Sequence, residues 1–103
     1  MSAYLGEFEQ LVLLAVIRLG TSATAASVRS TVEEASQRKV WIGAVHTTLD
    51  RLDAKGLVTS EVAERPEGRR KIFALTTAGD RAVSHAYATW SRATKGLKLK
   101  KAL

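Results

Sequence analysis

Three segments in the first half of the chain repeat apolar residues at the three- and four-residue spacing of an α-helix. Residues 7 to 19 are apolar on most sides, which predicts a helix that is covered from several directions. Residues 24 to 36 combine an apolar stripe with charged positions that face away from it. Residues 42 to 55 form the third segment, and its predicted buried face consists of Ile42, Val45, Leu49 and Leu52. The pattern therefore predicts three consecutive helices.

A glycine ends the third segment, and the residues after it are typical of a β-hairpin. After Gly56, residues 57 to 62 are rich in β-branched side chains, which favour a strand. Residues 65 to 68 combine proline with glycine and predict a turn. On the return strand, Phe73 and Leu75 alternate toward the core. Three helices followed by a two-stranded hairpin are the layout of a winged helix-turn-helix, an α+β fold.

A fourth helix is predicted after the hairpin. Thr77 to Asp80 resemble a capping box, so we expect the helix to begin there. Its apolar stripe is longer than a domain of this size needs, and we interpret it as a dimer contact. The stripe consists of Val83, Ala86, Tyr87, Trp90, Ala93 and Leu97. We therefore expect a winged-helix domain over residues 5 to 76 and a dimerisation helix with a basic tail over residues 77 to 103.

Charge is distributed unevenly along the chain. The formal net charge is +6, but the last twelve residues contain five cations and no acid, so residues 1 to 91 carry only +1. The five cations are Arg92, Lys95, Lys98, Lys100 and Lys101. The local placement of cations is therefore a better guide to binding partners than the net charge.

The composition excludes several classes of protein. The 103 residues leave room for one domain. Without cysteine the chain has no disulfide framework and no thiolate metal site, and this fits a reducing compartment, so we expect a cytoplasmic protein. The longest apolar run, residues 11 to 17, is about half as long as a bilayer span, so we expect neither a membrane helix nor a signal peptide.

The outer face of the third predicted helix carries small hydrogen-bonding side chains where a solvated helix usually carries Glu and Lys. Its adjacent threonines are weak helix formers, each costing a few tenths of a kcal/mol. A surface that faces a DNA groove needs short side chains near the base edges and a long cation near the phosphates. We predict base-edge contacts for Ala44, Thr47 and Thr48, and a phosphate contact for Arg51. The alternative is a surface helix without a partner.

A basic triplet, Arg69, Arg70 and Lys71, follows the predicted turn of the hairpin. Cations at such a projecting tip can lie across a phosphate backbone or enter a narrow minor groove. Basic triplets are also common as ordinary solubilising surface. The position of this triplet behind a recognition-type helix is what favours a DNA contact.

The residues that could support catalysis or metal binding are scattered. His46 and His85 have no second histidine or carboxylate at ligand spacing on their own helices. Asp50 and Asp53 face different sides of one helix and form no acid–base pair. The chain also lacks a glycine-flanked nucleophile and a phosphate-binding loop. We therefore expect no enzyme activity, no metal and no cofactor.

Trp90 is oversized for a helix stripe that is otherwise built from Ala, Val and Tyr. One interpretation is plain packing against the partner subunit, which we favour slightly. The other is a cavity at the dimer centre, where a flat apolar ligand stacks on the indole.

Several motifs in one order resemble those of PadR-type transcriptional regulators, a bacterial winged helix-turn-helix group. They are LGEFEQL at residues 5 to 11, GAVHTTLDRL at 43 to 52, KGLV at 55 to 58, GRRK at 68 to 71 and ALTTAG at 74 to 79. The resemblance implies a homodimer that binds a palindromic operator on double-stranded DNA, usually as a repressor. It also implies that the helix around Ala44 to Arg51 reads DNA and that Arg69 to Lys71 form the wing. Some members bind aromatic drugs at a C-terminal tryptophan, which Trp90 resembles, so release by a small-molecule effector is expected.

The chain departs from the family pattern at three places. His46 stands where a tyrosine is common in the recognition helix, and Thr24-Ala25 stand where Tyr-Gly is common at the second helix. A phosphate contact is therefore expected from His46 or Thr24. Ala74 replaces a frequent basic residue and reduces the charge of the wing. The rival interpretation is a winged-helix module that binds only other proteins.

Overall fold

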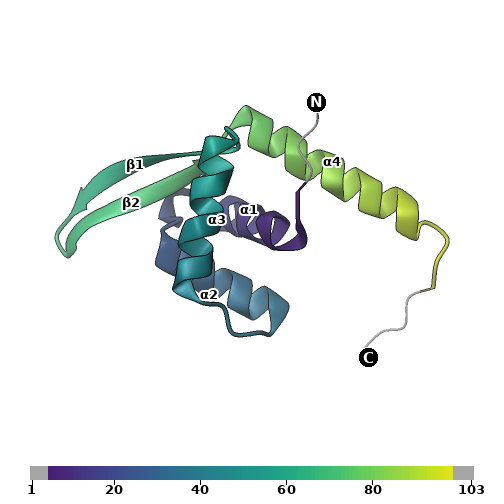
Figure 1. Cartoon of the computed structure of the whole chain (residues 1–103), viewed down its shortest axis with the longest axis horizontal. Coiled ribbons are helices and arrows are strands. Elements are labelled where there is room, and N and C mark those ends of the chain that lie inside the picture. The colour runs from purple at the N-terminus through teal and green to yellow at the C-terminus, as the bar shows by residue number, and fades with distance from the viewer. Residues whose placement is uncertain (1–4, 99–103) are drawn as a thin grey trace.

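Three helices pack around one apolar core in the computed structural model, which describes residues 5–98 (Figure 1). They are α1 (Glu7–Leu19), α2 (Ala25–Ser36) and α3 (Ile42–Ala54), with a 3-10 turn, η1 (Gly20–Ser22), after α1. The largest fully buried side chains are Leu13, Leu49, Leu52, Val12, Val28, Val32, Val45 and Val58. All three helices contribute to this core, so the prediction of three consecutive helices is confirmed.

Residue Thr24 begins α2 by capping it. The Thr24 hydroxyl accepts the backbone N–H of Ser27 at 3.1 Å, and the Thr24 N–H donates to Ser27 Oγ at 2.9 Å. This reciprocal pair satisfies backbone donors that the first turn of a helix leaves free. The helix therefore starts at Ala25, one residue later than the apolar pattern suggested.

The wing is an antiparallel hairpin of β1 (Val58–Arg65) and β2 (Gly68–Leu75) that projects from the helices (Figure 1). Its register pairs Val58 with Leu75 at the base and Arg65 with Gly68 at the tip. The expected strand over residues 57 to 62 is therefore too short, because the ladder continues through polar residues to the tip. At the base, the Phe73 N–H donates to the carbonyl of Ala23 at 2.8 Å and anchors β2 to the helical core.

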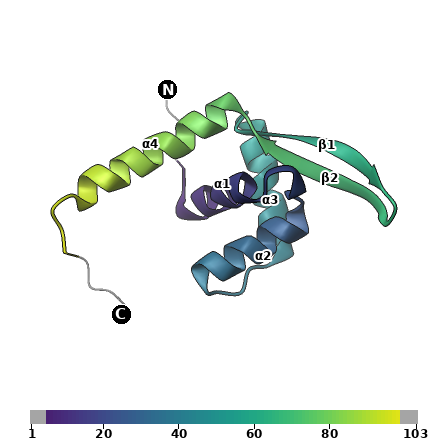
Figure 2. The same cartoon turned by 180° about the vertical axis from the view of Figure 1, so that it is seen from behind.

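Helix α4 (Thr77–Thr94) follows the wing. The two elements extend to opposite sides of the helical core (Figures 1 and 2). The predicted capping box at Thr77 is wrong by one residue, because Thr76 is the N-cap and accepts the Gly79 N–H at 3.0 Å. The Thr76 hydroxyl also donates to the Gly56 carbonyl at 2.7 Å.

Gly79 is buried where the first turn of α4 meets the chain that leaves α3. A Cβ at Gly79 would collide with the carbonyl oxygen of Leu57, so only glycine permits this approach. The Thr76 N–H donates to the same carbonyl at 3.1 Å. These contacts fix the direction in which α4 leaves the winged helix.

Candidate nucleic-acid interface

The face of α3 opposite the core lies at the front of the molecule in Figure 1 and is open to solvent. Four of the predicted contact residues are exposed on this helix, namely Ala44, His46, Thr47 and Arg51. The helix is held by Val45, Leu49 and Leu52, which have no exposed surface. The core therefore fixes the orientation of α3. Besides these four residues, the carboxylates of Asp50 and Asp53 are exposed on the helix.

The predicted position of Thr48 on the outer face of α3 is wrong. Its side chain is only 5% exposed, so it lies in the buried stripe and not on the outer face. The physical reason is its spacing, because Thr48 follows Val45 by three residues and precedes Leu52 by four. A base-edge contact from Thr48 is not compatible with this position. Ile42 differs in the opposite direction, because it was predicted on the buried face and is exposed.

Lys55, which directly follows the last residue of α3, is paired with α1. Its Nζ lies 2.9 Å from Oε2 of the buried Glu9. Burial by itself raises the pKa of the Glu9 carboxyl. The hydrogen bonds from Lys55 and the Gly6 N–H, together with the charges of Lys55 and Arg51, lower the pKa by more, so it lies below its ordinary value. Lys55 is thus a structural cation that ties α3 to α1.

The basic triplet of the wing is divided between the two faces of the hairpin, because successive side chains of a strand alternate. Arg69 and Lys71 share one face, and Arg70 projects on the other. Arg69 Nε lies 3.0 Å from Oε2 of its cross-strand neighbour Glu64, so its charge is offset within the wing. The triplet lies near the start of β2, directly after the turn.

Sequence reasoning missed Arg65 as a wing cation. It is exposed at the end of β1, and the register places it diagonal to Arg70 on the same face. The signal that could have found it is the two-residue period of a strand, because a ladder extended to residue 65 places Arg65 on the same face as Ala63, the partner of Arg70. The tip of the wing therefore carries Arg65 and Arg70 on one face and the Glu64–Arg69 ion pair on the other.

Thr24 is half-buried, and its hydroxyl takes part in the cap of α2. A phosphate contact by this hydroxyl would compete with the cap. His46, in contrast, is exposed on α3, and its phosphate contact stays a prediction.

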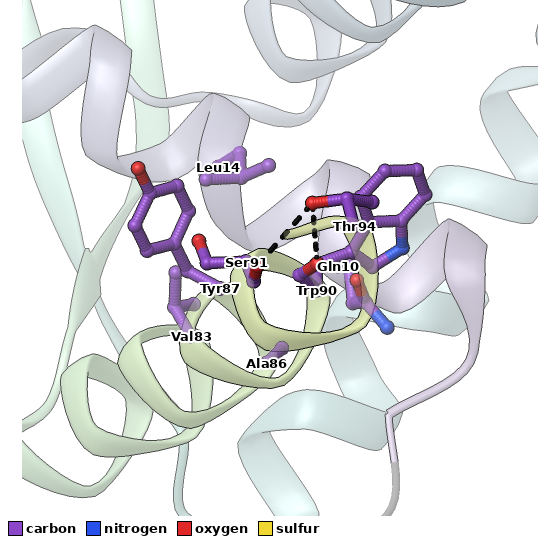
Figure 3. A pocket seen from close by; sticks show the side chains of 8 residues that line it. All are labelled: Gln10, Leu14, Val83, Ala86, Tyr87, Trp90, Ser91 and Thr94. Carbon is purple, nitrogen blue, oxygen red and sulfur yellow. Dashed lines mark hydrogen bonds between the residues drawn. The ribbon is translucent and has the colours of Figure 1, made fainter. Parts of the chain in front are cut away.

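A hollow of about 360 Å³ lies between α1 and α4 and contains the predicted dimer and effector residues (Figure 3). Its lining consists of Gln10, Leu14, Val83, Ala86, Tyr87, Trp90, Ser91 and Thr94. Figure 3 shows Tyr87 and Trp90 on either side of the hollow. Tyr87 is 75% exposed and Trp90 is 64% exposed, so the apolar stripe of α4 is uncovered in the single chain.

Two further properties concern residues 5–98. In this part of the chain no His, Cys, Asp and Glu side chains gather in a group that could hold a metal ion. None of the helices there combines the length and the apolar character needed to cross a bilayer. Lys100 and Lys101 of the predicted basic tail lie outside the described residues.

The model of the Transcriptional regulator PadR-like family matches residues 13–85. No protein of curated function matches the chain. The matched segment begins within α1 and ends within α4, and it includes α2, α3 and the whole wing.

Solved structures share this architecture. A PadR-like transcription factor from Bacteroides fragilis is 26% identical, with a TM-score of 0.72 over 85% of this chain and 84% of that chain. A PadR family regulator from Clostridium difficile R20291 is 22% identical, with a TM-score of 0.73 over 87% of this chain and 93% of that chain. F93 from STIV, a winged-helix DNA-binding protein, is 17% identical, with a TM-score of 0.72 over 91% and 98% of the two chains.

The fold is that of winged-helix DNA-binding proteins, and the family match spans more than half of the chain. Proteins of this family are DNA-binding transcription factors and not enzymes. The chain therefore belongs to the PadR-like family of transcriptional regulators.

Proposed function

We propose that this regulator acts in the cytoplasm as a homodimeric repressor that binds a palindromic DNA operator. The observation that carries the proposal is the open face of α3, which lies beside a cationic hairpin. That face presents Thr47 and Arg51, and the hairpin presents Arg65 and Arg70. A helix in the major groove with a wing on the adjacent backbone uses both features together.

The proposed contacts divide by chemistry. Ala44 and Thr47 have short exposed side chains that suit base edges. His46 and Arg51 flank them and reach toward phosphates. On the wing the exposed cations are Arg65, Arg69, Arg70 and Lys71, with Arg69 the weakest contributor because Glu64 offsets its charge.

The homodimer is supported by the apolar stripe of α4. An exposed stripe of this kind is costly in water, and a second copy that presents the same stripe covers it in a two-fold symmetric contact. Val83, Tyr87 and Trp90 are the central residues of the proposed contact, and Leu14 of α1 lies exposed beside them. We accordingly divide the chain into a DNA-binding part, residues 5 to 76, and a dimerisation part, residues 77 to 103.

A flat aromatic effector is a second proposed ligand, and the hollow beside Trp90 favours it. The lining is mostly apolar, with an exposed indole on which an aromatic ring can stack. Binding there would alter the packing of α4 and release the operator. In a Trp41→Phe background, where Trp90 is the remaining tryptophan, flat aromatic cations should quench the fluorescence. No quenching at any ligand concentration would contradict an effector site.

The DNA-binding proposal is tested with the exchange Thr47→Glu. A carboxylate on the open face of α3 meets the negative potential of the groove, so affinity for the DNA upstream of the protein's own gene should fall by about tenfold or more. Glu is a better helix former than Thr, so the fold should be retained. Electrophoretic mobility shift and circular dichroism measure the two effects.

The matched control is Thr89→Glu, the same exchange on an exposed position of α4. We expect it to bind DNA as the wild type does. A protein-interaction module predicts a different outcome, in which the wild type shows no salt-sensitive affinity for any duplex. Equal DNA binding by Thr47→Glu and Thr89→Glu would exclude α3 as the reading helix.

A further inference from the structure

The N-terminal end of α3 presents a large apolar surface to solvent. Trp41, which precedes the first residue of the helix, is 71% exposed, and its neighbour Ile42 is 38% exposed. Neither side chain is needed by the core, which α3 enters through Val45, Leu49 and Leu52. An indole of this size in water gains free energy when a partner covers it.

Helix capping does not explain Trp41. The residue occupies the N-cap of α3, yet its side chain makes no capping hydrogen bond. Ser, Thr, Asp and Asn are preferred there and contribute about 1 kcal/mol. Thr24 and Thr76 fill this role for α2 and α4 with hydroxyls that accept backbone N–H groups. The tryptophan therefore stands where local helix stability favours a small polar residue, which points to a contact outside the chain.

Cations surround this apolar end. Arg38 and Lys39 are exposed in the connection between α2 and α3, and Lys39 Nζ lies 5.2 Å from the centroid of the Trp41 ring. No acidic residue occurs from position 35 to position 49. Two carboxylates lie nearby, namely the half-buried Glu33, whose Oε2 accepts the Val40 N–H at 2.9 Å, and Glu7, which lines the same shallow hollow from α1. An apolar centre with a cationic edge matches a major groove, where phosphates flank the base edges and the thymine methyl is the apolar group among them.

The location agrees with this partner. Recognition helices contact base edges mainly with their N-terminal residues. Trp41 and Ile42 directly precede the exposed Ala44 and Thr47, so the apolar end continues the proposed DNA-reading face. We propose that Trp41 and Ile42 contact the 5-methyl group of one thymine in each half of the operator, and that Lys39 contacts a neighbouring phosphate. This inference rests on the proposed function, because it requires α3 to lie in the major groove.

A thymine-to-uracil scan tests the proposal. The intact protein first selects its preferred duplexes from a random pool, and each thymine is then replaced in turn by 2′-deoxyuridine, which removes only the methyl group. We expect one position in each half-site at which uracil weakens wild-type binding about fourfold, the value of one buried methyl group. At that position Trp41→Ser should bind thymine and uracil equally. Serine is a preferred N-cap, so this variant retains α3.

Two further variants separate the roles. Ile17→Ser removes an exposed apolar side chain of α1 and should retain the uracil effect. Lys39→Ala should retain it too, while flattening the salt dependence of binding by about one unit per protomer. Equal loss on uracil substitution in the wild type and Trp41→Ser overturns the inference but leaves the proposed function standing. A wild type that selects no duplex overturns the proposed function itself.

Discussion

At the scale of single residues, Glu9 and Lys55 are of charged types that usually lie on the surface, yet here they form an ion pair that joins two helices. Glu9 lies in the first turn of α1, where an acid suits the positive end of the helix. Its 2.9 Å contact with Lys55 joins α1 to the C-terminal end of α3. The pair thus helps to orient the helix whose opposite face is proposed to read DNA.

The Glu9 pair leads to a stability prediction. Its pKa lies below the ordinary value of 4.5, so its stabilising contribution is present above that pH and is lost as the pH falls through the lowered pKa. Glu9→Gln should reduce the free energy of unfolding at pH 7 by about 1–2 kcal/mol, and the difference from wild type should shrink in acid. Urea unfolding at several pH values measures this. The exposed neighbour Glu7→Gln should change little, and an equal loss in both variants would contradict the assignment.

Thr48 and Trp41 show what the sequence can and cannot predict for single residues. Thr48 lies at helical spacing from Val45 and Leu52, which places it in the buried stripe. Its burial could therefore have been predicted from the spacing alone, although threonine is a polar residue. Lys55 is different, because its partner Glu9 is distant along the chain and no local pattern links them. Trp41 sits at an N-cap, where side-chain exposure depends on how three helices meet.

At the scale of elements, the wing is where sequence and structure differ most. Helices α1 to α3 follow from apolar spacing because each helix satisfies its own backbone hydrogen bonds. A strand depends on its partner, so β1 continues through Glu61, Glu64 and Arg65, which are not typical strand residues. The N-cap at Thr76 was likewise decided by tertiary contacts, because the adjacent Thr77 is an equally good cap by residue type.

The Glu64–Arg69 pair of the wing leads to a prediction about DNA affinity. Glu64→Gln removes an anion from the hairpin and releases Arg69 for a phosphate, so affinity should rise about threefold at low salt. Glu67→Gln removes the same charge from the turn without releasing Arg69 and should gain less. Fluorescence anisotropy with a labelled operator measures both. A fall in affinity for Glu64→Gln would contradict this, and would show that the ion pair contributes to DNA binding by holding the conformation of the wing.

At the scale of the whole molecule, α4 and the wing extend to opposite sides of the core (Figures 1 and 2). The close approach at Gly79 fixes the direction of α4, and in the proposed dimer α4 would then fix the spacing of the two recognition helices. The apolar stripe was readable from the sequence through its helical spacing. The distance between the recognition helices of two copies could not be predicted from the sequence, because it depends on how the surfaces of the two copies meet.

The proposed dimer contact is tested with Trp90→Glu. Two buried carboxylates at a symmetric interface are strongly unfavourable, so the variant should sediment as a monomer at concentrations where the wild type is a dimer. Its affinity for the palindromic operator should fall about 100-fold or more, because each half-site then binds alone. Thr89→Glu, one position away and off the stripe, should stay dimeric. A monomeric wild type would contradict the assembly directly.

The most direct test of DNA reading by the α3 face and the wing is the salt dependence of operator affinity in the wild type and Arg70→Ala. Each lost phosphate contact should reduce the slope of log affinity against log salt by about one unit per protomer, and the affinity should fall for all sequences alike. Arg81→Ala, which removes an exposed arginine of α4, should keep the wild-type slope. An Arg70→Ala protein with unchanged slope and affinity would contradict the account.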